Sequence, residues 1–261
     1  MTGEQMDLEI RGRNALVLGA SSGIGEAVAL ALAREGVNLA IAARRMERLE
    51  RVAGRAGELG SPRVRAVTVD LEEERSIDAM MEELRRSFGA VDIVVLNGGG
   101  PAAGRFSDVA LTQWDDAYRL ILRSMLKVTK AVVPAMRAQR WGRVVALTST
   151  SVKQPIETLV LSNAFRTALV SALRTLANEV ASDGVTVNSI ATGRVDTARL
   201  RELYDDDEAK LRRAGSEVPI GRTASAEEYA PLVAFLCGEP ARYITGQTIS
   251  IDGGLVRGIF G

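Results

Sequence analysis

Ser162 and Arg166 are polar residues beside an apolar helical face, and their types could support chemistry. The run TLVLSNAFRTALVSALRTLANEVA (158–181) carries apolar residues at helical spacing. At about 100° per residue, Ser162 and Arg166 lie one turn apart at the edge of that face. A guanidinium can hold ribose hydroxyls, a carboxylate or an oxyanion, and a hydroxyl can position a substrate oxygen. The pattern predicts a functional site, or else two side chains that satisfy each other or a backbone group.

The residue types that are missing restrict this chemistry. The sequence has no histidine and one cysteine, Cys237, which argues against zinc and iron–sulfur sites and against an intrachain disulfide. Catalysis must therefore use Ser, Tyr, Lys, Arg, Asp, Glu or a bound cofactor. We interpret Cys237, within an apolar helical run, as a core residue. The acidic cluster at 205–208 is interpreted as a solvated loop or helix face, and no metal site is predicted.

Bulk composition narrows the class of protein. The 261 residues include 46% hydrophobic residues, 33 Lys plus Arg and 33 Asp plus Glu, so the net charge is zero. This balance indicates no nucleic-acid or membrane-surface partner, and no apolar run reaches the ~18 residues of a membrane span. The polar N-terminus does not resemble a signal peptide, and the single cysteine fits a reducing cytoplasm. We expect a cytoplasmic protein with a small-molecule substrate.

Short apolar runs alternate with longer helical patterns along the chain. Strands are predicted at 15–19, 37–43, 64–70, 92–97, 143–149, 185–190 and 247–252. Helices are predicted at 25–35, from residue 46, at 75–88, 112–138 and 158–181, and near 225–237. This alternation predicts one α/β domain over 1–261 with a Rossmann fold, a doubly wound parallel sheet of about seven strands with helices on both faces.

The loop VLGASSGIGEA (17–27) joins the first strand to the first helix. Gly19, Gly23 and Gly25 permit a tight turn and close approach of a ligand. The helix N-terminus behind them offers free N–H groups and a positive dipole end, which suit a pyrophosphate. An ordinary strand–helix turn would look similar, but at the first βα turn of such a chain the spacing favours a dinucleotide site.

The end of the second strand indicates which dinucleotide is bound. The sequence there is AIAARR, with no acidic residue to bind a ribose hydroxyl. Arg44 and Arg45 could instead pair with a 2′-phosphate, so NADP(H) is preferred over NAD(H). Solvated arginines at a helix start are the alternative. Asp70, after the third strand, could accept a hydrogen bond from adenine or cap the next helix.

Motifs along nearly the whole chain resemble those of the short-chain dehydrogenase/reductase family. They include GASSGIG (19–25), DIVVLNGGG (92–100), GRVVALTSTS (142–151), VTVNSIATG (185–193) and YITGQTISIDGG (243–254). The last block is similar to the 3-oxoacyl carrier-protein reductase branch. The resemblance implies a Ser that positions a carbonyl, a Tyr that donates a proton, a Lys that lowers the pKa of that Tyr, and an Asn that supports a water relay.

This chain departs from the family pattern at three of those four positions. The Ser is retained as Ser149, whereas the Tyr position falls on Ser162, the Lys position on Arg166 and the Asn position on Ile121. Leu18 replaces the usual Thr before the first glycine, and Thr192 replaces the usual Pro before Gly193. The resemblance therefore implies an atypical site without the usual Tyr and Lys.

The candidate catalytic residues are Ser149, Ser162, Arg166 and Lys153, the last in a loop expected to roof the site. A desolvated lysine can act as acid or base, although a solvated loop lysine is equally compatible. Tyr118, Tyr204, Glu157 and Asn163 are weaker candidates. The predicted cofactor-binding residues are Gly19, Ser21, Ser22, Gly23, Ile24, Gly25, Arg44, Arg45, Asp70, Leu71, Asn97, Gly98, Gly99, Arg166, Gly193, Val195 and Thr197.

Two functions from different classes follow. The first is an NADP(H)-dependent oxidoreductase that transfers hydride to or from a small carbonyl or a conjugated enone at an atypical site. The second is a non-catalytic NADP-binding sensor or structural subunit, which the missing Tyr and Lys favour. The resemblance also implies a homotetramer or homodimer, and we expect segment 194–218 to form a substrate lid.

Overall fold

Seven parallel strands form one sheet in residues 6–259, the part of the chain that this computed structural model describes. The strands are β1 (Asn14–Leu18), β2 (Asn38–Ala43), β3 (Val64–Thr68), β4 (Ile93–Leu96), β5 (Gly142–Leu147), β6 (Val185–Thr192) and β7 (Thr248–Ile251). Their order is β3-β2-β1-β4-β5-β6-β7. The order reverses between β1 and β4, which is where such sheets bind ligands, at the carboxyl ends of the strands. The predicted fold class is confirmed.

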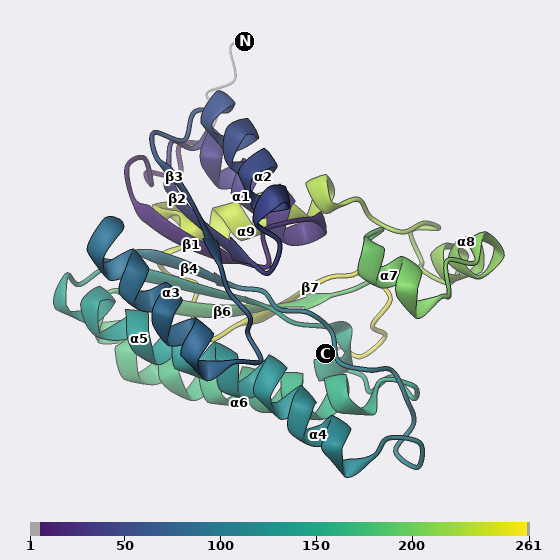
Figure 1. The fold of residues 1–261 in the computed structure, drawn as a ribbon. Coiled ribbons are helices and arrows are strands. Elements are labelled where there is room, and N and C mark those ends of the chain that lie inside the picture. Colours follow the sequence, from purple (N-terminus) through teal and green to yellow (C-terminus); the bar gives the residue numbers. More distant parts are fainter. Residues whose placement is uncertain (1–5, 260–261) are drawn as a thin grey trace, which may run out of the picture.

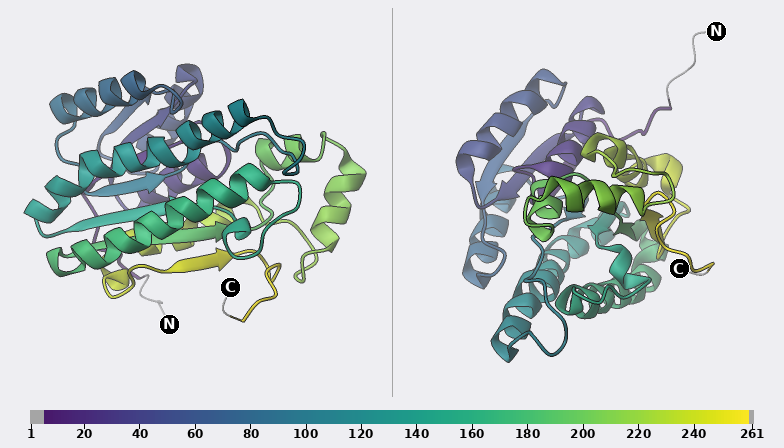
Figure 2. Two further views of the ribbon diagram at one scale, coloured as in Figure 1. Left: turned by 90° about the horizontal axis from the view of Figure 1, so that it is seen from below. Right: turned by 90° about the vertical axis from the view of Figure 1, so that its right-hand side faces the viewer.

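Helices cover both faces of the sheet (Figures 1 and 2). One face carries α1 (Gly23–Arg34), α2 (Met46–Glu58) and α9 (Ala226–Cys237). The other carries α3 (Glu74–Ser87), α5 (Ser124–Ala138) and α6 (Val160–Val180). Each face therefore has its own hydrophobic core, and side chains that alternate along the strands contribute to both.

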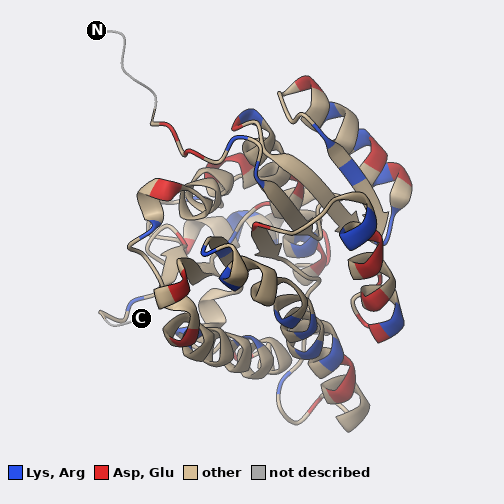
Figure 3. Cartoon of the chain, turned by 90° about the vertical axis from the view of Figure 1, so that its left-hand side faces the viewer, with Lys and Arg blue, Asp and Glu red and all other residues tan. Residues whose placement is uncertain are grey.

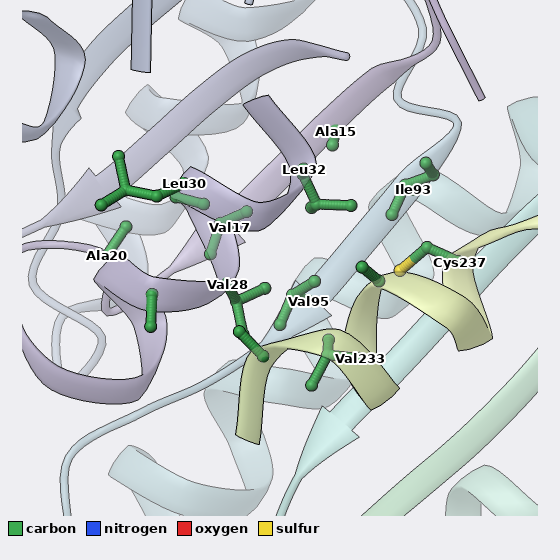
Figure 4. Packing of buried hydrophobic residues seen from close by; sticks show 14 of the residues in the cluster. Ala15, Val17, Ala20, Val28, Leu30, Leu32, Ile93, Val95, Val233 and Cys237 are labelled. Carbon is green, nitrogen blue, oxygen red and sulfur yellow. The ribbon is translucent and has the colours of Figure 1, made fainter. Parts of the chain in front are cut away.

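The core between the sheet and the helices α1 and α9 is built mainly from aliphatic side chains (Figure 4). Val17 and Val95 of the sheet, Val28 of α1 and Val233 of α9 are each 0% exposed. Fully burying such side chains stabilises the fold by roughly 1.5–3 kcal/mol each. Cys237 lies in this core, where burial raises the pKa of its thiol to about 12. Its interpretation as a core residue is confirmed.

Charged residues of both signs lie on the helices that surround the sheet, as Figure 3 shows. Many of them form exposed ion pairs within or between elements, such as Arg65 with Glu83 and Arg123 with Glu74. Exposed pairs of this kind contribute little to stability, about 0–1 kcal/mol each. Among the described residues, no helix is long and apolar enough to cross a bilayer.

The ends of several strands differ from the prediction by one or two residues. β1 ends at Leu18 because Gly19 has a φ of +63°, which leaves the extended conformation. β3 ends at Thr68 rather than at 70, and β6 continues to Thr192 because it pairs with β7 as far as Ile251. α1 begins at Gly23, two residues earlier than predicted.

The predicted helix over 112–138 is interrupted by a π-helical turn. It consists of α4 (Leu111–Ala117), the π turn η1 (Tyr118–Arg123) and α5. A π turn inserts an extra residue into a helix and often lies near a functional site. Ile121, at the position that the resemblance assigned to Asn, lies in this turn and is buried. Apolar periodicity alone could not reveal the extra residue.

Aromatic rings pack between this interrupted helix and the start of α6. Trp114 of α4 packs edge to face on Phe165 of α6, with ring centroids 5.8 Å apart. Phe106 packs on Trp114 at 6.1 Å, and Tyr118 on Phe165 at 6.2 Å. Such pairs add about 0.5–1.5 kcal/mol each beyond burial of their area. They hold the turn of α6 that carries Ser162 and Arg166.

The opposite end of the sheet contains a buried arginine that is paired with a carboxylate. Arg143, the second residue of β5, has a side chain that is 2% exposed and lies 3.1 Å from Glu239. It also donates to the backbone carbonyls of Gly142, Gly184 and Gly238, at 2.9 to 3.3 Å. The Trp141 ring lies 4.2 Å from its guanidinium. The charge is therefore satisfied by a carboxylate, by carbonyls and by a π face.

The segment 194–218 forms two short helices beyond the carboxyl ends of the strands, α7 (Ala198–Leu203) and α8 (Glu208–Ser216) (Figure 1). The acidic cluster lies between and on them. Asp205 and Asp206 have positive φ values, and Asp207 caps α8 by accepting from Ala209 N at 2.8 Å. In residues 6–259, no three acidic, cysteine or histidine residues are placed to hold a metal ion.

Candidate functional site

A cavity of about 650 Å³ lies at the carboxyl ends of the strands, beneath α7. It extends from the end of β2 to the ends of β5 and β6, across the point where the strand order reverses. The structure brings all of the predicted cofactor residues to its wall. These are Gly19, Ser21, Ser22, Gly23, Ile24, Gly25, Arg44, Arg45, Asp70, Leu71, Asn97, Gly98, Gly99, Arg166, Gly193, Val195 and Thr197.

The loop between β1 and α1 is tight enough that only glycine fits at two positions. A Cβ on Gly25 would lie 2.2 Å from the carbonyl oxygen of Gly19, and one on Gly19 would lie 2.7 Å from Nδ2 of Asn97. The loop leads directly into the N-terminus of α1, whose N-cap Ser22 makes no capping hydrogen bond through its side chain. First-turn N–H groups of a helix have no intrahelical partner. This part of the wall is therefore a cradle for an anion.

Arg44 and Arg45 lie exposed at the end of the cavity formed by β2 and β3. No Asp or Glu in residues 6–259 forms an ion pair with either of them. The pKa of Arg45 is lowered by partial burial and by the charges of Arg48 and Arg44. The guanidinium groups are therefore available to a phosphate.

Asp70 neither caps α3 nor pairs with an arginine. Its carboxylate accepts from the backbone N–H of Glu72 at 3.0 Å, and its own N–H donates to Ser76 at 2.9 Å. The residue before α3 is Glu73, which makes no side-chain cap. Of the two roles predicted for Asp70, the cap is wrong, because the helix begins four residues later. Asp70 remains on the cavity wall.

Ser149, Ser162 and Arg166 meet at the other end of the cavity. Ser149 follows β5 and begins a short 3₁₀ turn, η2 (Thr150–Val152), where its hydroxyl accepts from the Ser151 N–H at 3.1 Å. Ser162 is 5% exposed, and its hydroxyl accepts from Nε of Arg166 at 3.2 Å. Each serine oxygen therefore already accepts a hydrogen bond, which leaves its own proton free to donate to a ligand.

Arg166 is held by backbone carbonyls and by Ser162, with no carboxylate partner in residues 6–259. Its NH1 group donates to Leu147 O at 3.2 Å and its NH2 group to Gly99 O at 3.4 Å. These contacts use three of the five N–H donors of a guanidinium. Burial, and then the charge of Arg199, lower the pKa of Arg166 to about 10, so it remains charged at neutral pH.

Arg199 of α7 is a cavity residue that the sequence did not reveal. Its NH2 group donates to Pro101 O at 2.5 Å, and its NH1 group donates to Glu202 at 3.0 Å. The sequence of segment 194–218 has no recognisable pattern, and only the fold places this arginine beside the loop after β4. The one indication in the sequence was that Arg199 is a charged residue near the start of the segment expected to form a lid.

A second feature that sequence reasoning missed is the contact between Thr192 and Tyr229. Thr192 lies on the cavity wall, and its hydroxyl is 2.6 Å from the hydroxyl of Tyr229, a residue that is 0% exposed. Burial raises the pKa of Tyr229, so the phenol stays protonated. If Tyr229 donates to Thr192, the Thr192 proton is free to point into the cavity. Thr192 thus places a hydroxyl on the cavity wall at a position where the resemblance implied Pro.

The structure does not bring Lys153 into the cavity wall. Lys153 is the C-cap of η2 and is not among the residues that line the cavity, so its role as an acid or base stays a prediction. The weaker candidates Tyr118, Tyr204, Glu157 and Asn163 also lie outside the wall. Asn163 instead holds both backbone groups of Ile156.

Comparison with known proteins assigns this arrangement to a family. Residues 19–256 match the family model described as Enoyl-(Acyl carrier protein) reductase. The chain is 33% identical over 248 residues to the 3-oxoacyl-[acyl-carrier-protein] reductase FabG of Escherichia coli (strain K12), covering 95% of this chain and 99% of that protein. The chain belongs to the short-chain dehydrogenase/reductase family. It is therefore an oxidoreductase by family, as the motifs predicted.

Two solved structures of reductases are similar to this one over almost the whole chain. L-sorbose reductase from Gluconobacter frateurii, complexed with NADPH and L-sorbose, has a TM-score of 0.92 and 33% identity, covering 97% of this chain and 100% of that one. A variant of the actinorhodin polyketide ketoreductase, solved with NADPH, has a TM-score of 0.89 and 32% identity, covering 95% and 98%. Both of these neighbours are reductases that bind NADPH.

Proposed function

We propose that this short-chain dehydrogenase/reductase is an NADP(H)-dependent reductase acting on a small carbonyl or conjugated enone, with an atypical site of Ser149, Ser162 and Arg166. The observation that carries the proposal is the arrangement of these three side chains. Two hydroxyl protons are free to donate into the cavity, and a guanidinium lies directly behind one of them.

The cavity wall fits NADP(H) along its length. The glycine cradle and the N-terminus of α1 suit the pyrophosphate, and the exposed Arg44 and Arg45 suit a 2′-phosphate. The NADPH complexes of the two neighbours support the same choice. When bound, the cofactor supplies or accepts a hydride. Arg166, through its free N–H groups, is placed to hold ribose hydroxyls or a substrate oxygen.

The residues at the reacting end stabilise negative charge better than they transfer a proton. Ser149 and Ser162 donate to the substrate oxygen, and Arg166 polarises Ser162 through its Nε–H. A serine hydroxyl is a much weaker acid than a phenol of pKa about 10. We infer that water, or Lys153, supplies the proton. Conjugate reduction suits such a site, because the oxyanion is stabilised first and carbon is protonated afterwards.

The decisive experiment follows NADPH absorbance with simple ketones, 3-oxo thioesters and α,β-unsaturated ketones as substrates. Turnover restricted to the unsaturated compounds would support conjugate reduction, the reaction of the matching family model's description. Turnover of ketones or 3-oxo thioesters would support carbonyl reduction, the reaction of the FabG relatives. Absence of turnover on all three classes, with tight NADPH binding, would contradict the proposal.

That last outcome would favour the alternative, a non-catalytic NADP-binding sensor or structural subunit. One observation points towards it. Arg166 is already bonded to Ser162, to Leu147 O and to Gly99 O, as expected if these side chains merely satisfy one another. Against it, Arg166 keeps unused donors on the cavity wall and has no carboxylate among the described residues to balance its charge.

We also propose that the chain assembles as a homodimer or homotetramer. α6 carries small residues, namely Ala168, Ser171 and Thr175, which permit close helix packing. β7 is the half-buried edge strand of the sheet. Size-exclusion chromatography with light scattering would measure the mass directly, and a mass equal to that of one chain, 27.9 kDa, would contradict the proposal.

A further inference from the structure

Two arginines from distant parts of the sequence lie on either side of one short loop. Arg166 of α6 donates to the carbonyl of Gly99, and Arg199 of α7 donates to the carbonyl of Pro101. An imagined Cβ on Gly100, between these two carbonyls, would lie 2.5 Å from Nε of Arg199. The loop after β4 therefore brings two guanidinium groups together at the substrate end of the cavity.

Two like charges bonded to the same short loop repel each other unless a negative charge is near both. The charge of Arg199 contributes to the lowered pKa of Arg166, second to burial. Glu202, which also lines the cavity, pairs with Arg199 at 3.0 Å, and 70% of its side chain is accessible. Exposed pairs of that kind stabilise little. Within residues 6–259, nothing acidic pairs with Arg166, so the cavity has excess positive charge at this point.

The position of Arg199 indicates that this charge serves the substrate and not the cofactor phosphates. Thr197, the N-cap of α7, faces the glycine cradle, since its Cγ2 would lie 3.1 Å from a Cβ on Gly23. Arg199 instead donates to Pro101 O, and its Nε would lie 2.5 Å from a Cβ on Gly100. It therefore lies against the Gly99–Pro101 loop, whose Gly99 carbonyl accepts from Arg166.

We propose that Arg166 and Arg199 together bind an anionic group of the substrate, and that this group is a carboxylate close to the reacting carbonyl. The substrate class is then a small oxo acid or unsaturated acid rather than a neutral ketone or a sugar. Planar guanidinium groups recognise a planar carboxylate through paired hydrogen bonds. This inference rests on the proposed function of the same cavity.

The test compares each acid with its neutral ester in the full-length protein saturated with NADP⁺. Acetoacetate, levulinate and crotonate, each against its methyl ester, would be titrated by isothermal calorimetry. Two charge-assisted hydrogen-bonding groups predict that at least one acid binds about tenfold or more tightly than its ester. Equal affinity within each pair, or absence of binding by all three acids, would overturn the inference.

Variants then test which residues cause the tighter binding of the acid than of the ester. Arg199→Met is expected to reduce the ratio of acid to ester affinity to about twofold or less, with ester affinity unchanged. Arg242→Met removes the same charge from an exposed position outside the cavity wall and should leave the ratio intact. A ratio that survives in Arg199→Met and in Arg166→Met would contradict the assignment to this pair.

Fluorescence titration with NADPH separates the two proposals. Wild-type protein that fails to bind NADPH would refute the proposed function, whatever the acids do. Wild-type protein that binds NADPH but treats acid and ester alike would refute this inference alone. If Arg199→Met weakens NADPH about tenfold and preserves the acid preference, the arginine serves a cofactor phosphate and the inference is wrong.

Discussion

Arg143 and Arg166 are both arginines beside a hydrophobic core, and they lie at opposite ends of the sheet. Arg143 has Glu239 at 3.1 Å, three backbone carbonyls and the face of Trp141. Arg166 has one hydroxyl and two carbonyls. Both carry a guanidinium, but Arg143 is fully buried with a carboxylate partner, whereas Arg166 is half-buried on the cavity wall and has no carboxylate partner among the described residues.

This difference shows how a structural arginine can be told from a functional one. A buried charge is tolerated only when neighbouring groups replace the water that it has lost. At Arg143 the protein provides every replacement itself. Under the proposal made above, the negative charge that balances Arg166 comes from a bound ligand.

The largest expected effect on turnover is that of replacing Arg166. Arg166→Met should lower turnover by about 100-fold or more, because a preorganised donor at a developing oxyanion is removed. The free energy of unfolding should change by less than about 1 kcal/mol, since no paired carboxylate is stranded. Initial rates and urea denaturation on the same samples would measure both quantities. Near-normal turnover would remove Arg166 from the mechanism.

The reverse pattern is expected for Arg143→Met. Removing one partner of a buried pair should destabilise the fold by about 3 kcal/mol, while turnover per folded molecule stays near that of wild type. Glu239 is partly accessible, so Arg143→Met combined with Glu239→Gln should recover part of the loss. If Arg143→Met has the same free energy of unfolding as wild type in urea denaturation, Arg143 is not a structural arginine in the sense used here.

The third prediction concerns Arg44 and Arg45, at the end of the cavity formed by β2 and β3. Arg44→Ala with Arg45→Ala should weaken NADPH binding by about 30-fold and NADH binding much less, because only NADPH has a phosphate to lose. Fluorescence titration with both dinucleotides gives the two affinities. Arg51→Ala on α2, exposed and outside the cavity wall, is the matched control. Equal losses for both dinucleotides would contradict the assignment.

A smaller effect is expected from Tyr229→Phe. The change removes the hydroxyl that orients Thr192 and should reduce stability by about 1 kcal/mol and turnover by a few-fold. Thr192→Val in the same background should then add little, because the two hydroxyls act as one unit. Additive losses in this double-variant cycle would show that the two groups act independently.

The smallest expected effect concerns pH. Burial holds the pKa of Arg166 at about 10, below its ordinary value, so the charge is fully present at neutral pH. The preference for acid over ester should stay constant from about pH 6.5 to about pH 9 and decline only above the lowered pKa. Calorimetry across this range would measure it. A loss of preference near neutrality would assign it to another group.

The cofactor end of the cavity could be predicted from sequence almost completely. Gly19 and Gly25 belong to one tight turn within a single stretch of sequence, so their spacing alone could indicate it, whereas the contact with Asn97, 78 residues from Gly19, comes from the fold. Alternating apolar runs likewise predicted the sheet and its helices, with errors confined to boundaries and to the π turn. Such features depend on neighbours in the chain, and periodicity records them.

The substrate end could be predicted only in part. Ser149, Ser162 and Arg166 were found because they replace or retain residues at expected positions. Arg199 and Tyr229 lie in segments with no pattern of their own, and their roles depend on contacts with Pro101 and Thr192, which are 98 and 37 residues away. The π turn at Tyr118–Arg123 was missed because apolar periodicity was interpreted as one continuous helix and does not identify a π turn within it.

The protein has two tryptophans, one at each of the contrasted ends. Trp141 lies against Arg143, whereas Trp114 packs on Phe165, the neighbour of Arg166 in the chain. Replacing either one by phenylalanine leaves a single tryptophan fluorophore at a known place. The emission of Trp114 would then follow events at the site, and that of Trp141 would follow the integrity of the scaffold. The molecule thus contains separate optical reporters for ligand binding and for unfolding.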